Sequence, residues 1–185
     1  QTSEEILSFI DCDINANYIR YYAPMEDGSV FLYLNDWESM STDLVVLTKK
    51  QASEVTQKEA ITLGCMYLDG DIQKNIINFN KTNEKYRITV KDYSKDIGEE
   101  EDAYEQAMMR MNNELLTGNG PDLLVLDNVN VNQLAAKGVW EDLNPYLDGS
   151  SLIKREELVE SVLKAYTAGD VLISIPSSFN ISTLL

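Results

Sequence analysis

Residues 117–128, TGNGPDLLVLDN, constrain the fold of this chain more than any other stretch. A turn rich in glycine precedes the apolar run LLVL (123–126), and Asp127 and Asn128 end it. Pro121 prevents the preceding helix from resuming, because its ring clashes with a helical backbone and it has no N–H to donate. An apolar run without alternation is typical of a strand that is buried on both faces of a parallel sheet.

From residue 60 onward, patterns of strands and helices alternate along the chain. The predicted strands are 60–67, 86–93, 123–126 and 171–176, and the predicted helices are 71–80, 99–116, 131–137 and 155–166. Ile72, Ile76 and Phe79 recur at helical spacing in the first of these helices. Alternation of this kind predicts an α/β fold with a mostly parallel sheet and helices on both of its faces.

The first 50 residues have a different pattern. Four β-branched and aromatic runs, at 6–14, 18–25, 29–36 and 43–50, are separated by turn residues, and Asp27-Gly28 indicates a hairpin. They predict a small antiparallel four-stranded β segment, which has the size of one propeller blade. The polar stretch 51–59 is interpreted as a linker, so the predicted organisation is 1–50, 51–59 and 60–185.

Charge and composition narrow the possible functions. The chain carries a net charge of −16, which disfavours nucleic acid and anionic membranes as partners, since both require a basic surface. It has no histidine, the commonest general base and a common zinc ligand. Two neighbouring acids could serve a glycosidase, but with 31 acids in the chain such a pair has little meaning. The sequence predicts no enzyme, no catalytic residues, no metal and no cofactor.

Cys12 and Cys65 lie far apart and form no CxxC motif. A disulfide between them and two buried free thiols both remain open, with the thiols favoured. No apolar run approaches the roughly 18 residues of a membrane span, and no signal sequence opens the chain. Gln1 is therefore interpreted as the start of a mature product or of a fragment.

Ligands of open α/β sheets bind beyond the carboxyl ends of the parallel strands. The residues expected there are Tyr67, Asp69 and Asp71 after the first strand, Tyr93 after the second, Asp127 and Asn128 after the third, and Ser177, Ser178 and Phe179 after the last. Carboxylates, amides, hydroxyls and aromatic rings together suit a neutral polyhydroxylated ligand. The other interpretation is that these residues are polar because loops are solvated and turns favour Asp and Asn.

Several stretches together resemble a known family. They are ITLG (61–64), IINFNKTNEKYRITVKDY (76–93), ELLTGNGPDLLVLD (114–127), the KG-W-EDL-PYLD pattern (137–148), ESVLKAY (160–166) and IPSSFNISTL (175–184). In order and spacing they resemble the N-terminal lobe of family 1 extracellular solute-binding proteins of ABC transporters, the sugar-binding type. Residues 1–58 lie outside this likeness and resemble the end of a propeller-like region.

The resemblance implies one lobe of a periplasmic-binding-protein-like fold, truncated before the second lobe. It implies a bacterial cell-surface lipoprotein that captures a sugar or oligosaccharide and delivers it to permease subunits, with a lipid anchor as its membrane link. Ligand contacts would come from the loops after Tyr67 and Asp127 and from residues 177–179. With half of the cleft missing, the chain alone is expected to bind sugar weakly or not at all.

An alternative from another class is the receiver domain of a response regulator. Asp69, Asp71 and Asp127 would then gather at the strand ends to hold Mg²⁺ beside a phosphoacceptor aspartate. This function also needs a lysine near the end of the last strand, where the sequence has Ser177 and Ser178.

Overall fold

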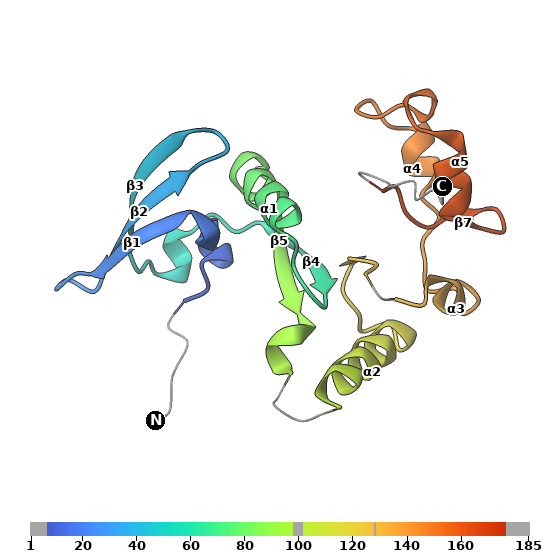
Figure 1. Cartoon of the computed structure of the whole chain (residues 1–185), viewed down its shortest axis with the longest axis horizontal. Helices are drawn as coiled ribbons and strands as arrows, with labels where there is room; N and C mark the ends of the chain where they lie inside the picture. Colours follow the sequence, from blue (N-terminus) through green and yellow to red (C-terminus); the bar gives the residue numbers. More distant parts are fainter. Residues whose placement is uncertain (1–6, 98–101, 128, 177–185) are drawn as a thin grey trace, which may run out of the picture. The chain divides into compact units, whose positions relative to one another are not determined.

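The structure is a computed structural model that describes residues 7–97, 102–127 and 129–176 (Figure 1). The chain divides into two compact units, one of residues 1–109 and 121–127 and the other of residues 110–120 and 128–185. The predicted linker, 51–59, lies within the first unit and contains a short 3-10 helix, η3 (Ala52–Glu54). Within the described residues, no helix has the length and apolar character needed to cross a bilayer.

The β segment is an antiparallel sheet in the order β1 (Ile19–Pro24), β2 (Val30–Asp36) and β3 (Ser41–Leu47). Three of the four predicted strands are therefore confirmed, and so is the hairpin at Gly28, whose φ is 81°. One face of the sheet buries Leu32 and Leu34 against Ile14. This small core holds the sheet together.

The strand predicted over 6–14 is wrong for the residues that the structure describes. Ile10–Cys12 forms a 3-10 helix, η1, and Ala16–Tyr18 forms another, η2. Between them Asp13 has a φ of 58°, which lies in the left-handed region and is incompatible with a strand. Residues 1–6 lie outside the described residues.

A three-stranded parallel sheet follows, in the order β5 (Tyr86–Asp92), β4 (Glu59–Cys65) and β6 (Leu123–Leu124). The fold class is thus mixed α/β. It has a parallel sheet, as predicted, and antiparallel sheets that come before and after it in the sequence. The central strand is β4, which buries Leu63 and Cys65.

The expectation that LLVL is a buried strand is wrong. Only Leu123 and Leu124 pair with β4, so β6 is an edge strand of the sheet, and Leu123 is exposed. The Asp122 carboxylate accepts a hydrogen bond from the Thr62 N–H at 2.8 Å, and the Val125 N–H donates to the Gly64 carbonyl at 2.9 Å. The run therefore serves as a short edge strand that leaves the ladder after two residues.

Helix α1 (Gly70–Thr82) packs against β5 and confirms the helix predicted over 71–80. Its buried residues are Ile76, Ile77 and Asn80, whereas Ile72 and Phe79 are only half-buried. The buried face of the helix is therefore formed by Ile76, Ile77 and Asn80, and it only partly coincides with the predicted face of Ile72, Ile76 and Phe79.

Helix α2 (Ala103–Leu116) confirms the described part of the helix predicted over 99–116; residues 98–101 lie outside the described residues. Ala103, Ala107 and Met111, which recur at helical spacing, are buried on one side of the helix. Gly118 follows the helix with a φ of 72°, the left-handed conformation that commonly ends helices.

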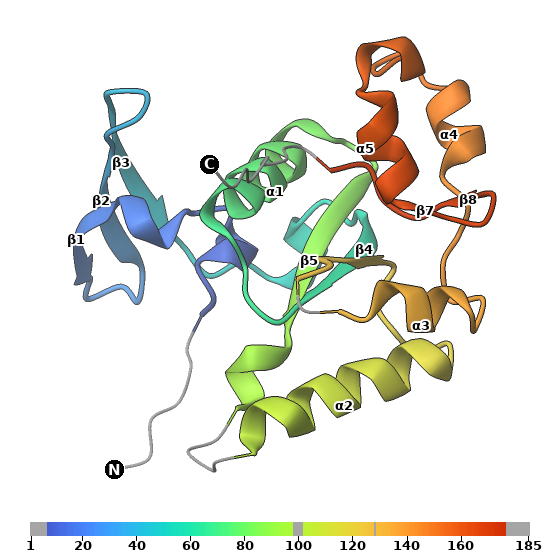
Figure 2. The ribbon, with the colours of Figure 1, turned by 45° about the vertical axis from the view of Figure 1, so that its right-hand side comes forward.

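The second unit contains short elements. They are α3 (Val131–Ala135), α4 (Asn144–Asp148), η5 (Arg155–Glu157), α5 (Glu160–Ala165), β7 (Thr167–Ala168) and β8 (Val171–Leu172). Leu147, Leu163 and Leu172 form the core where α4, α5 and the β7–β8 hairpin meet (Figure 2).

Two predictions fail in this unit. The helix predicted over 155–166 is interrupted, because the Glu157 carboxylate accepts from the Lys154 N–H and closes a separate 3-10 turn before α5 begins. The strand predicted over 171–176 pairs only at Val171 and Leu172, antiparallel to β7, and does not extend the parallel sheet. The Asp142 carboxylate fixes this hairpin by accepting from the Leu172 N–H at 3.1 Å.

Candidate functional site

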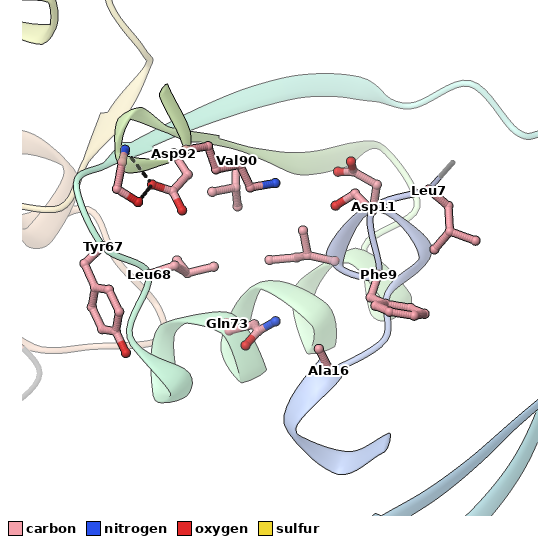
Figure 3. A pocket seen from close by; sticks show the side chains of 13 residues that line it. Leu7, Phe9, Asp11, Ala16, Tyr67, Leu68, Gln73, Val90 and Asp92 are labelled. Atoms are coloured by element: carbon pink, nitrogen blue, oxygen red, sulfur yellow. Dashed lines mark hydrogen bonds between the residues drawn. The ribbon is translucent and has the colours of Figure 1, made fainter. Parts of the chain in front are cut away.

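A pocket of about 450 Å³ lies at the carboxyl end of β4 and β5, where the α/β pattern predicted a ligand (Figure 3). Its size falls within the range of roughly 300–1,000 Å³ that is usual for small-molecule sites. The lining residues come from three places: Leu7, Ser8, Phe9, Ile10, Asp11 and Ala16 from the N-terminal segment; Tyr67, Leu68 and Gln73 from the β4–α1 region; and Val90, Asp92, Ser94 and Lys95 from β5 and the turn after it.

The β4–α1 loop supplies Tyr67, whose side chain is 71% exposed, and Leu68. The loop ends at Asp69, the N-cap of α1, whose carboxylate accepts from the Asp71 N–H at 2.8 Å. Among the predicted ligand-binding residues of this loop, Tyr67 lines the pocket. Asp69 and Asp71 are exposed and do not. The Asp69 carboxylate caps the helix, and the Asp71 carboxylate lies in the first turn, where the helix dipole favours a negative charge.

The end of β5 supplies Asp92, which accepts hydrogen bonds from the Ser94 N–H at 2.9 Å and the Ser94 hydroxyl at 2.6 Å. These bonds turn the chain into η4 (Tyr93–Asp96) and place Ser94 and Lys95 beside the pocket. Tyr93 is only 1% exposed, with the Lys91 ammonium 5.0 Å from its ring centre. Tyr93 therefore belongs to the core and is not among the residues that line the pocket.

The remaining predicted residues do not join the pocket. Asp127 follows β6 and is exposed, but it does not line the pocket. Asn128, Ser177, Ser178 and Phe179 lie outside the described residues. Across residues 7–97, 102–127 and 129–176, no three His, Cys, Asp or Glu side chains gather into a group able to hold a metal ion. The structure therefore does not form the carboxylate cluster that the receiver alternative requires.

Sequence reasoning missed one side of the pocket. Residues 7–11 were assigned to a strand of the separate β segment, yet they face the parallel sheet across the cavity (Figure 3). They are tied to β5 by Arg87, which is 74 residues from its ion-pair partner Asp13. No local pattern reveals a contact over such a separation. Gln73 and Lys95 were missed because single polar residues in a helix or a turn carry no distinctive signal.

The two cysteines are not bonded to each other. Cys65 is fully buried at the end of β4, and burial, together with the Asp92 carboxylate, raises the pKa of its thiol to about 11. Cys12 is exposed; partial desolvation and the neighbouring Asp11 and Asp13 carboxylates raise the pKa of its thiol. The favoured expectation of free thiols is confirmed, but only one of them is buried.

We expect iodoacetamide to label one thiol of the native protein and two thiols of the denatured protein. At about pH 8 the thiolate is the reacting species, and Cys65 has neither access to reagent nor a thiolate population. Intact mass gives the number of labels, and peptide mapping should place the native label on Cys12. Rapid native labelling of Cys65 would contradict the burial of the β4 end.

Comparisons with models of protein families, with curated proteins and with solved structures found no match for this chain.

Proposed function

We propose that this chain captures a small carbohydrate in the pocket at the carboxyl end of β4 and β5. The observation that carries the proposal is the position of that pocket, lined by Tyr67 and by the ends of two adjacent parallel strands. In open α/β sheets this is the place where ligands bind. The mixed α/β fold and the parallel sheet are compatible with the solute-binding lobe that the sequence resembles.

The chemistry of the lining suits a sugar. Tyr67 offers an exposed ring for stacking on an apolar sugar face. Phe9 also lines the pocket, but it packs against the small core of Ile14, Leu32 and Leu34. Gln73 and Lys95 offer hydrogen-bond donors to sugar hydroxyl groups, and the Ser94 hydroxyl, which donates to Asp92, offers an acceptor. Rings together with a few polar groups are the usual composition of a selective small-molecule site.

The cellular role follows from the resemblance and belongs to the same proposal. The chain would act as part of an extracellular, lipid-anchored bacterial receptor that delivers its sugar to the permease subunits of an ABC transporter. In that family a second lobe completes the cleft. We therefore expect this chain alone to bind a sugar with a Kd on the order of 1 mM, about −4 kcal/mol, rather than in the micromolar range.

The test is a titration of the full chain with glucose, galactose, maltose and xylobiose, followed by amide NMR chemical shifts. We expect one sugar class to shift signals of residues 7–11, 67–73 and 90–95 and to leave α5 unchanged. Tyr67→Ala should weaken that binding about tenfold, or about 1.4 kcal/mol. Tyr146→Ala is the matched control, because Tyr146 is 64% exposed and lies outside the pocket.

Either of two outcomes would contradict the proposal. One is the absence of shifts with all four sugars at concentrations well above the expected Kd. The other is an equal loss of affinity in both tyrosine variants, which would place the sugar elsewhere. Shifts only with Mg²⁺ and a phosphoryl mimic would instead favour the receiver alternative.

A further inference from the structure

Arg87 joins two segments that the sequence assigns to different domains. It lies on β5, and its guanidinium donates to both carboxylate oxygens of Asp13 at 2.9 and 3.0 Å and to the Asp11 carbonyl at 2.6 Å. The Arg87 and Asp13 side chains are 26% and 20% exposed. Solvent screens a bidentate, half-buried ion pair of this kind much less than it screens an ion pair on the surface.

The segment that Arg87 holds is a compact turn, here called the N-terminal turn (7–14). It is closed by its own backbone: the Cys12 N–H donates to the carbonyls of Ser8 and Phe9, and the Asp13 N–H donates to the Ile10 carbonyl. Asp13 has the left-handed φ of 58°, which is uncommon for a residue with a side chain. The Arg87 guanidinium favours this conformation because it donates to the Asp13 carboxylate and to the Asp11 carbonyl at the same time.

The N-terminal turn forms one side of the pocket, and Arg87 does not. Figure 3 shows Leu7, Phe9 and Asp11 of the turn across the cavity from Leu68 and Asp92, and Arg87 is not among the lining residues. We infer that Arg87 is a positioning residue, which holds the N-terminal turn in place as a wall of the pocket. The effect of Arg87 on sugar affinity rests on the proposed function, whereas its effect on the position of the N-terminal turn does not.

The test compares the wild-type chain with Arg87→Gln, Arg87→Lys and Lys85→Gln. Lys85→Gln is the matched control, because it removes a cation two residues away whose partner Glu59 is 4.0 Å distant, with both side chains about two-thirds exposed. Hydrogen exchange of amides 12–14 reports on the turn. We expect exchange at least about tenfold faster in Arg87→Gln, an intermediate change in Arg87→Lys, which keeps the charge but loses the fork, and no change in Lys85→Gln.

Two further measurements distinguish a loss of the pocket wall from general unfolding, and they do so without a bound ligand. Exchange at Ile76 and Ile77 of α1 should stay as in the wild type, since both residues belong to the core. A soluble gadolinium chelate should relax the methyl groups of Leu68 and Val90 faster in Arg87→Gln, because the pocket that they line loses one side. Neither readout requires a bound sugar.

Unchanged exchange of the turn in Arg87→Gln would overturn the inference, and so would unchanged relaxation at Leu68 and Val90. If one of the four sugars binds, its Kd should rise at least about tenfold in Arg87→Gln and remain unchanged in Lys85→Gln. Equal affinity despite an open turn would show that the wall is not part of the sugar site. Failure of all sugars to bind the wild type would remove the proposed function, and the exchange and relaxation results would still decide whether Arg87 holds the wall.

Discussion

Replacing Gly64 by alanine should destabilise the fold by about 3 kcal/mol, at the upper end of the usual cost of overpacking. Gly64 lies in the central strand β4 and pairs with Leu124 of β6. A Cβ atom there would lie 2.5 Å from Cγ of Pro121 and 3.1 Å from Cδ1 of Leu124. The proline ring is fixed to the backbone and cannot rotate away, so β6 has to move and the bond from Val125 N–H to the Gly64 carbonyl is lost.

Urea unfolding measures this loss, and Gly70→Ala is its control. Gly70 is the first residue of α1, and a Cβ atom added there meets nothing within 4 Å. We expect Gly70→Ala to be neutral or to stabilise the fold by up to about 1 kcal/mol, because alanine restricts the unfolded chain. A Gly64→Ala variant as stable as Gly70→Ala would mean that Pro121 does not pack on β4.

Replacing Asn80 by alanine should cost about 3 kcal/mol, since two backbone groups lose their partner at once. Asn80 is 1% exposed. Its side-chain amide donates to the Ile88 carbonyl at 2.9 Å, and its side-chain oxygen accepts from the Ile88 N–H at 2.7 Å. An N–H and a C=O of the same strand residue point to the same side, so Ile88 directs both groups to α1 rather than to β4.

Thermal and urea unfolding of Asn80→Ala, Asn80→Asp and Asn75→Ala test this contact. Asn80→Asp keeps the acceptor but removes the donor and places a carboxylate near the Ile88 carbonyl, so we expect it to be at least as damaging as alanine. Asn75 is exposed on the same helix, and its replacement should change stability by no more than about 0.5 kcal/mol. Equal stability of the Asn80→Ala and Asn75→Ala variants would contradict the role of the buried amide.

The elements with a strong local signal were predictable from the sequence. β1–β3, β4, α1, β5 and α2 have periodic apolar residues and distinct turns or caps, such as Gly28 and Asp69. The failures have non-local causes. Residues 7–14 are as apolar as a strand, but Arg87 holds them in a turn, and the strand predicted over 171–176 is diverted into a hairpin by the Asp142 carboxylate.

The candidate site was predictable in position but only partly in composition. The rule that ligands bind at the carboxyl ends of parallel strands points to the place where the pocket lies, and Tyr67, which the rule selects, is among its lining residues. It could not separate residues that face the cavity from those that cap a helix, as Asp69 does, or fill the core, as Tyr93 does. Spacing within a loop does not determine the direction of a side chain.

The two hydrogen bonds between Asn80 and Ile88 also bear on how the sheet can meet another molecule in solution. Among the described residues, β5 pairs with β4 alone, which makes it an edge strand of the kind on which a strand from another molecule can add. At Ile88 the amide of Asn80 already occupies the donor and the acceptor that such a strand would need. One buried side chain thus protects the sheet against association between molecules as well as against unfolding.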